Sequence, residues 1–213
     1  DIEFAPRAEI LERTLPAMRA LQEEGKVRYI GITGYPLEVL REVAGAGEVD
    51  AVLSYCHYSL LHTGLDRVLA PLAREQGIGL VNGSPLHMGA LTGEGPPDWH
   101  PAPPAVLEAA REAAAWCRDE DAAIEDVALR FAVANPSVAS TLVGMRSEAE
   151  VVANLRAMRG DTDPDLLAGV RAILEPVAEV DWEVGLPENN PNGAAADPGD
   201  PRRSRASGER GSL

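Results

Sequence analysis

Short runs of aliphatic and β-branched residues recur along the chain and alternate with stretches of helical periodicity. Each run is mainly apolar and lacks the regular alternation of apolar and polar positions that a half-exposed strand shows. The pattern therefore predicts strands that are buried on both faces. These predicted strands span residues 27–33, 49–55, 78–84 and 137–145.

The stretches between the strands place apolar residues three and four positions apart, which predicts amphipathic helices. Glycine and proline mark their ends, since Gly25 and Gly77 follow predicted helices and Pro36 opens one. The predicted helices span residues 9–24, 36–45, 65–76, 105–120, 124–134, 147–158 and 161–183.

Strands that alternate with helices indicate βα units and a parallel sheet, so the predicted fold class is α/β. A doubly wound sheet and a (β/α)8 barrel both satisfy this order of elements. The chain has no GxGxxG motif after a strand, which argues against the doubly wound dinucleotide-binding fold.

The two ends of the chain differ from its middle. Residues 184–213 contain almost no large apolar side chain and cannot bury enough surface to offset the entropy of ordering. We therefore predict a folded unit over residues 1–183 and a disordered tail over 184–213. The chain opens on Asp1 without an initiator methionine, and we interpret it as a piece of a longer protein.

Composition and charge exclude several function classes. The net charge of −15 argues against binding to nucleic acid or to an anionic membrane surface, because both need basic patches. No apolar run approaches the roughly 18 residues that a membrane span needs. The two cysteines, Cys56 and Cys117, are too few for a disulfide framework, so we expect a cytoplasmic protein.

The histidines do not predict a metal site. No two of them have the i, i+4 spacing of a helical zinc site, and no cysteine and histidine array is present. His57 and His87 follow strand ends and are candidates for lining a substrate pocket, with chance placement in loops as the alternative. His62 and His100 are interpreted as loop histidines.

The glycine-rich and polar points of the chain lie where each predicted strand ends. In parallel βα architectures, ligands bind at the carboxyl ends of the strands. This rule selects the segments 33–35, 54–58, 82–86 and 144–147 as the candidate site.

The segments around these four points resemble the aldo/keto reductase family, in the order and spacing of that family. The resemblance covers residues 1 to about 158, and SYCHYSLL and VNGSPLHMG look most like its L-galactose and L-fucose dehydrogenase-like branch. The matching stretches are GKVRYIGIT, SYCHYSLL, NGSPLHMGALTG and LVGMRSEAEVVANL.

The resemblance implies a (β/α)8 TIM barrel, of which this chain holds the C-terminal half, about four βα units. It also implies an oxidoreductase that transfers hydride between NAD(P) and a carbonyl or alcohol, with a sugar or aldehyde as substrate. In this family a tyrosine is the general acid, and a lysine, an aspartate and a histidine support it. A cation beside the tyrosine is needed because its ordinary pKa is about 10.

None of these four catalytic residues is expected in this chain. The family's aspartate, tyrosine and lysine belong to its first half, and its histidine directly precedes the position of Asp1. The tyrosines that are present match other family positions, so no catalytic residue is assigned and we expect the chain alone to be inactive. These tyrosines are Tyr29, Tyr35, Tyr55 and Tyr58.

The resemblance does carry over the part of the site that binds the cofactor. Thr33 and Gly34 occupy the positions of a Ser-Asn pair that binds the nicotinamide carboxamide in the family. Tyr55 replaces a glutamine that binds the same carboxamide. Gly83 stands where many members place a tyrosine that stacks on the nicotinamide. Ser84 and Leu86 match the loop whose backbone wraps the pyrophosphate, since oriented N–H groups bind anions.

The last segment indicates which cofactor is used. NADP-preferring relatives place Lys or Arg at the positions of Gly144 and Glu150, where a carboxylate would repel a 2′-phosphate. The strand-end turn also contributes Met145 and Arg146, and Asn154 matches a contact to the adenine, with an ordinary surface residue as the alternative. We predict NAD, and NADP stays an alternative because Arg146 can serve a phosphate.

Two other functions remain open from the sequence. A degenerate barrel can bind nucleotide for regulation without catalysis. A half barrel can also self-associate through its open strand edges, which otherwise are sites of aggregation.

Overall fold

Four parallel strands form the centre of the molecule, which is described here from a computed structural model covering residues 1–47 and 49–190. The strands lie in the order β1-β2-β3-β4, so each pairs with its neighbour in the sequence. Their bounds are β1 (Gly31–Gly34), β2 (Ala51–Tyr55), β3 (Gly79–Gly83) and β4 (Ser140–Leu142).

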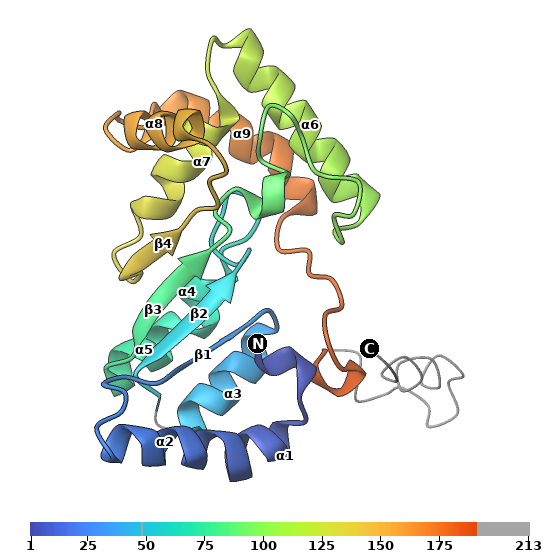
Figure 1. The fold of residues 1–213 in the computed structure, drawn as a ribbon. Helices are drawn as coiled ribbons and strands as arrows, with labels where there is room; N and C mark the ends of the chain where they lie inside the picture. The colour runs from blue at the N-terminus through green and yellow to red at the C-terminus, as the bar shows by residue number, and fades with distance from the viewer. Residues whose placement is uncertain (48, 191–213) are drawn as a thin grey trace, which may run out of the picture.

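Helices follow each strand and cover the sheet, as Figure 1 shows. Their ends follow the local sequence: Gly77 adopts φ 72° at the end of α5, and the Ser147 hydroxyl caps the start of α8. The helices are α1 (Arg7–Glu9), α2 (Leu15–Glu23), α3 (Leu37–Gly47), α4 (Gly64–Val68), α5 (Ala70–Gln76), α6 (Pro104–Asp119), α7 (Ile124–Val133), α8 (Glu148–Ala157) and α9 (Pro164–Leu174). A π-helical stretch, η2 (Ile10–Thr14), joins α1 to α2, and the short helices are η1 (Ile2–Phe4), η3 (His87–Gly89), η4 (Glu175–Val177) and η5 (Pro187–Asn189).

The first hydrophobic core packs the sheet against the helices on one of its faces. Ile32, Val52 and Leu80 contribute one residue from each of three neighbouring strands. These residues form pairs in the ladder, Ile32 with Val52 and Val52 with Leu80, so they make one continuous row. The helical side of this core is formed by Val39, Leu40, Val43, Leu65, Leu69 and Ala73.

A second core lies between helices α6, α7 and α9. In α6 the buried positions Val106, Ala110, Ala113 and Cys117 recur every three or four residues and form a narrow stripe. Small side chains in this stripe let α9 pack closely against α6, with Val170 and Leu174 as its buried contacts.

The arrangement confirms the predicted fold class, since four sequential parallel βα units are what half of a (β/α)8 barrel contains. β1 and β4 each have one neighbouring strand within the described residues. Tyr29 beside β1 and Leu142 in β4 are 73% and 51% exposed. The two outer strands are therefore more exposed to solvent than the middle strands. None of the helices in the described part of the chain combines the length and apolar content needed to cross a bilayer.

Two of the predicted strands are shorter in the structure than in the prediction. β1 starts at Gly31 instead of residue 27, because Val27 and Tyr29 are exposed and the Asp50 side chain accepts the Ile30 N–H. β4 covers only residues 140–142 of the predicted 137–145, since it has a single partner strand.

The last predicted helix was too long, and this correction matters for the site. Helix α9 ends at Leu174, and the chain becomes extended at Ala178 after Pro176, which has no N–H to continue a helix. Glu179 adopts φ 62°, which turns the chain away from the helix axis. Asp181 and its neighbours therefore lie in an extended segment instead of a helix.

The residues just after position 183 differ from the predicted tail. Asn189 and Asn190 are buried, and the Asn189 side chain donates to the carbonyls of Glu3 and Ala5. The Leu186 N–H also donates to Glu3 O, so this segment lies beside the N-terminus (Figure 1). Amide side chains supply here the contacts that apolar residues do not, while residues 191–213 of the predicted tail lie outside the described residues.

The first core predicts the effect of a truncation in α3. Leu40 is completely buried, so Leu40→Ala should lower the free energy of unfolding by about 2–5 kcal/mol, measured by urea denaturation. Leu155→Ala is the matched control because Leu155 is 50% exposed, and it should change stability by less than about 0.5 kcal/mol. Equal losses in the two variants would contradict this description of the core.

Candidate cofactor site at the ends of the strands

The parallel pairing brings the carboxyl ends of the strands together at one end of the sheet. Gly34 pairs with Ser54, and Ser54 pairs with Asn82. One residue further along, Tyr55 pairs with Gly83, and Gly83 pairs with Leu142. Predicted site residues of β1, β2 and β3 therefore lie in two adjacent rows of the sheet, and the predicted segment 144–147 begins two residues after Leu142.

Tyr55 reaches from the end of β2 to the N-terminal segment. Its hydroxyl donates a hydrogen bond of 2.8 Å to Glu3 Oε1, and its ring lies 5.4 Å from that of Tyr35. Burial raises the pKa of Tyr55 above its ordinary value, and the hydrogen bond to Glu3 and the charge of Glu3 add to this effect. The phenol therefore stays protonated and acts as a donor at neutral pH.

Glu3 is a site residue that the sequence reasoning missed. Its side chain is completely buried, and its second oxygen, Oε2, has no hydrogen-bond partner among the described residues. A Cβ atom placed on Gly34 would lie 2.7 Å from this oxygen. The missing side chain at Gly34 therefore leaves the space that a buried, unpartnered carboxylate oxygen occupies.

The loop after β3 is held in a strained conformation. Ser84 adopts φ 54°, its N–H donates to Leu142 O, and its carbonyl accepts from His87 N–H. Leu86 packs its side chain against the second core, and its carbonyl accepts from Gly89 and Leu91. The part of this loop that can face a ligand is therefore Ser84 with the neighbouring backbone.

Cys56 fixes the same corner from the β2 side. It has φ 64°, its N–H donates to Gly83 O, and its thiol contacts the Ser84 hydroxyl. Burial raises the pKa of the Cys56 thiol to about 12, partly offset by that hydrogen bond, so the thiol stays protonated. This cysteine supports the loop instead of acting as a nucleophile.

The turn from β4 into α8 is the exposed part of the predicted site. Gly144, Met145 and Arg146 are all exposed, and nothing lies within 4 Å of a Cβ built on Gly144. The Arg146 N–H donates to Glu150 Oε2 at 2.5 Å, and the guanidinium lies 3.5 Å from Glu150 Oε1. Glu150 therefore occupies the first turn of α8 and partly neutralises Arg146, while Asn154 lies half-buried one turn further along.

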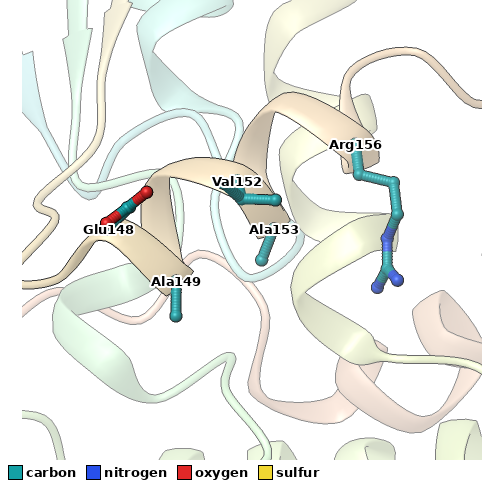
Figure 2. Close-up of a pocket in the computed structure, with 5 residues that line it drawn as sticks. All are labelled: Glu148, Ala149, Val152, Ala153 and Arg156. Carbon is teal, nitrogen blue, oxygen red and sulfur yellow. The ribbon is translucent and has the colours of Figure 1, made fainter.

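A hollow of about 520 Å³ opens elsewhere on α8 (Figure 2). At the helical period of about 100° per residue, Glu150 and Asn154 lie on a different face of α8 from this hollow. The hollow contains none of the predicted cofactor residues, and we do not assign it to the site. Its lining consists of Glu148, Ala149, Val152, Ala153 and Arg156.

A second polar cluster lies beside Tyr35, at the end of β1. Asp181 Oδ1 accepts from the Tyr35 hydroxyl at 3.2 Å and lies 3.1 Å from His57 Nε2. Trp182 stacks on Tyr35 with ring centroids 4.7 Å apart, which holds the C-terminal segment over the strand end. Burial raises the pKa of Tyr35 far above its ordinary value, and the nearby Asp181 charge adds to this.

The same carboxylate also meets a second histidine. His62 Nε2 lies 3.3 Å from Asp181 Oδ1, and His62 Nδ1 lies 3.2 Å from Glu179 Oε2. Burial alone would raise the pKa of Asp181, but hydrogen bonds with His57 and His62 outweigh it and hold this pKa far below its usual range. Burial lowers the pKa of His57, despite the nearby Asp181.

All four histidines are buried, which the sequence reasoning did not anticipate for His62 and His100. His87 contacts Ser59 Oγ through Nδ1, and burial, with the neighbouring His100, lowers its pKa to about 3. His100 Nε2 bonds to the His87 carbonyl. No periodicity could have identified these partners, because Asp181 and His57 are 124 residues apart in the sequence.

Residues 3–175 match the sequence profile of the Aldo/keto reductase family. Over 196 residues the chain is 41% identical to the L-galactose dehydrogenase of Arabidopsis thaliana, which covers 89% of this chain and 61% of the plant protein. It is 32% identical over 142 residues to the D-arabinose 1-dehydrogenase of Saccharomyces cerevisiae, covering 62% of this chain and 42% of the yeast protein.

The similarity extends to solved structures. The holo form of the aldo-keto reductase AKR11C1 from Bacillus halodurans superimposes with a TM-score of 0.57 at 23% identity, over 81% of this chain and 58% of that protein. This likeness supports the fold. The chain spans about three fifths of the length of the plant relative. Together, the profile match over residues 3–175 and the identity to the plant enzyme show that the chain belongs to the aldo/keto reductase family.

Proposed function

We propose that the protein oxidises a sugar, or reduces a related aldehyde, with NAD as its preferred cofactor, and that this chain supplies the cofactor-binding side of the site. The observation that carries this proposal is the row of polar groups and glycines at the four strand ends. The family to which the chain belongs uses nicotinamide cofactors, which supply the hydride acceptor or donor of the reaction.

The names of the relatives support a sugar or a small aldehyde as the substrate class. Two of them are named for L-galactose and D-arabinose. A third, 27% identical over 188 residues, is the NADH-specific methylglyoxal reductase of Escherichia coli. An aldose and an α-oxoaldehyde share an aldehyde carbon next to a second carbon that bears oxygen. We propose this group as the reacting end of the substrate.

The end of the site near β1 and β2 fits a nicotinamide carboxamide. Such a group has one acceptor and two N–H donors. The Tyr55 hydroxyl and Thr33 supply polar partners, and the unpartnered Glu3 Oε2 is a buried acceptor beside Gly34. We propose that Glu3 replaces the amide that Gly34 lacks, because an unpaired buried carboxylate oxygen is costly until it accepts a hydrogen bond.

The strand-end loop after β3 fits a pyrophosphate. Ser84 has a positive φ and lies at the junction of β3 and β4, and we propose that its hydroxyl and the Leu86 N–H face an anion. Leu86 contributes through its backbone position, since its side chain packs into the second core. No basic side chain is needed for this role.

The start of α8 favours an unphosphorylated ribose. Glu150 accepts the Arg146 N–H and approaches its guanidinium, so the positive charge that could hold a 2′-phosphate is already partly neutralised. A carboxylate accepts hydrogen bonds from ribose hydroxyls but repels a phosphate. We propose that Gly144, Met145 and Asn154 complete the adenosine end, because Gly144 leaves open space beside the turn.

Proton transfer is the step that this chain does not support alone. Lys26 is its only lysine, and it lies exposed and paired with Glu24. The pKa values of Tyr35 and Tyr55 are raised by burial and by carboxylates, the opposite of what a general acid near neutral pH requires. We therefore propose that the catalytic tyrosine and lysine lie outside these residues.

The cofactor proposal is tested by the Glu150→Gln variant. The chain should bind NADH more tightly than NADPH, measured by quenching of cofactor fluorescence. Glu150→Gln should shift the ratio of the two dissociation constants toward NADPH by about fivefold, equivalent to about 1 kcal/mol. Glu148→Gln, an exposed change in the same helical turn, is the control and should leave the ratio unchanged. Tighter binding of NADPH by the unchanged chain would refute the preference.

The catalytic proposal is tested by turnover of the same chain. With L-galactose and NAD⁺, the 213-residue chain should form NADH no faster than the buffer alone, because no lysine-activated tyrosine is available. Binding of NADH serves as the control that the site has folded. Measurable turnover would show that a group in this chain transfers the proton.

The open edges of the sheet support a proposal of self-association. Leu142 in β4 and Val152 and Leu155 in α8 are 51%, 60% and 50% exposed, and β4 has a single partner strand within the described residues. We expect the chain to elute as a dimer or larger species in size-exclusion chromatography with light scattering. Val152→Glu should shift this equilibrium toward the monomer, and a monomer at all concentrations would argue against it.

A further inference from the structure

A cluster of two histidines and a carboxylate lies next to the proposed cofactor site and is not used by it. His57 follows β2, His62 precedes α4, and Asp181 belongs to the extended segment after α9. The two imidazoles are 1% and 4% exposed, with ring centroids 4.7 Å apart. The nitrogen and oxygen atoms that face each other all lie within 4.8 Å of one another.

One oxygen of this cluster, Asp181 Oδ1, has more polar neighbours than it has lone pairs to accept hydrogen bonds. Asp181 Oδ1 lies 3.2 Å from the Tyr35 hydroxyl, 3.1 Å from His57 Nε2 and 3.3 Å from His62 Nε2. A carboxylate oxygen offers about two lone-pair directions, so three donors compete for them. A cation between Oδ1 and the two imidazoles would leave it with two partners, the ion and Tyr35.

Each imidazole also has a partner on its far nitrogen. His57 Nδ1 lies 2.9 Å from Ser54 Oγ, and His62 Nδ1 lies 3.2 Å from Glu179 Oε2. Imidazoles that bind metal ions usually donate their other N–H to a carboxylate or another oxygen, which fixes the ring and the tautomer. Both Nε2 atoms are therefore oriented toward Asp181.

The carboxylate behind His62 is itself held firmly. Glu179 Oε1 accepts from the Thr63 N–H at 2.8 Å and from its hydroxyl at 2.7 Å, and Arg67 contacts Glu179 Oε2 at 2.7 Å. These contacts keep Glu179 in place, so it can accept the Nδ1–H of His62. When the proton of His62 is on Nδ1, the arrangement is a carboxylate–histidine pair, and the Nε2 lone pair of His62 can bind an ion.

We propose that His57 Nε2, His62 Nε2 and Asp181 Oδ1 form a binding site for a divalent transition metal ion of the zinc class. Zinc bonds to imidazole and carboxylate are about 2.0–2.1 Å long, so neighbouring ligands of a tetrahedral ion lie about 3.3 Å apart. The two separations from Asp181 Oδ1 are 3.1 Å and 3.3 Å, close to that value.

Two nitrogen ligands and one oxygen suit zinc, cobalt or nickel better than magnesium or calcium, which prefer oxygen ligands. The Asp181 side chain is 46% exposed, so the fourth position faces solvent and takes water. The ion joins the end of β2 and the start of α4 to the C-terminal segment, and thereby fixes Trp182 over Tyr35. This role does not depend on the proposed reaction.

The same atoms permit a competing arrangement without metal. The Gly64 N–H lies 3.0 Å from His62 Nδ1, and if it donates there, the His62 proton is on Nε2 and bonds to Asp181. In that arrangement the cluster is a hydrogen-bond network and has no lone pair for an ion. Metal binding distinguishes the two arrangements directly.

The test uses the complete chain after treatment with a chelator. Titration with Co²⁺ should produce visible ligand-field absorption that saturates at a single ion per chain, and Zn²⁺ should displace it. Zn²⁺ should also raise the melting temperature, because an ion that binds only the folded state stabilises it. Asp181→Asn should abolish both signals.

Two further variants distinguish carboxylates that support the proposed metal site from carboxylates that do not. Glu179→Gln should weaken Zn²⁺ binding by about tenfold to a hundredfold, measured by calorimetry, because it removes the partner of His62 and not a ligand. Glu183→Gln changes an exposed carboxylate two residues beyond Asp181 and should have no effect. Circular dichroism should show that all of these variants are folded without metal.

Two results would overturn the proposal. The first is an absence of Co²⁺ absorption in the unchanged, folded chain. The second is equal Zn²⁺ affinity in the unchanged chain and in a His57→Asn, His62→Asn double variant, which would place the ion elsewhere. Either result would assign the cluster to the hydrogen-bond network alone.

Discussion

Parallel pairing of strands in sequence order is the constraint from which the rest of the molecule follows. Each parallel strand is followed by a crossover that returns the chain to the end of the sheet where the strands begin. All strands therefore have their carboxyl ends at the opposite end of the sheet. The register then places Gly34, Ser54 and Asn82 in one row and Tyr55 and Gly83 in the next. The β1, β2 and β3 part of the candidate site begins in those two rows.

The repetitive part of this architecture could be predicted from the sequence, because it is encoded locally. The apolar row of Ile32, Val52 and Leu80 lies in uninterrupted apolar runs, and Gly77 ends a helix by adopting positive φ. Such signals need no knowledge of distant residues. The strand ends of the candidate site were found for the same reason, since a strand end is a local feature.

What could not be predicted depends on contacts between distant segments. Glu3 appears in the sequence as one acidic residue among many, yet it is completely buried against Tyr55, 52 positions away. The helical pattern predicts a helix through residue 183, but the turn at Glu179 redirects the chain. His62 was placed among loop histidines because its partners, Glu179 and Asp181, come from the other end of the described chain.

In the proposed function, this chain holds the cofactor and residues outside it transfer the proton. Holding a dinucleotide requires donors, acceptors and space, and the strand ends offer these at Tyr55, Glu3 and Gly144. Transferring a proton requires a phenol with a lowered pKa beside a cation. The buried tyrosines here face carboxylates, so their environment moves the pKa in the other direction.

The segment after α9 shows how far a few polar groups can determine the path of a chain. Between Ala178 and Asn190 the segment has little regular structure, and Val180 and Trp182 supply its apolar contacts with the second core. Carboxylates that lose part of their hydration gain from hydrogen-bond partners, which favours a path that pairs Glu179 and Asp181. In the described chain the two carboxylates find these partners in Thr63, Arg67, Tyr35 and the two histidines. These polar contacts and the stacking of Trp182 on Tyr35 together hold the segment over Tyr35, where it closes one side of the strand ends that the proposed cofactor would occupy.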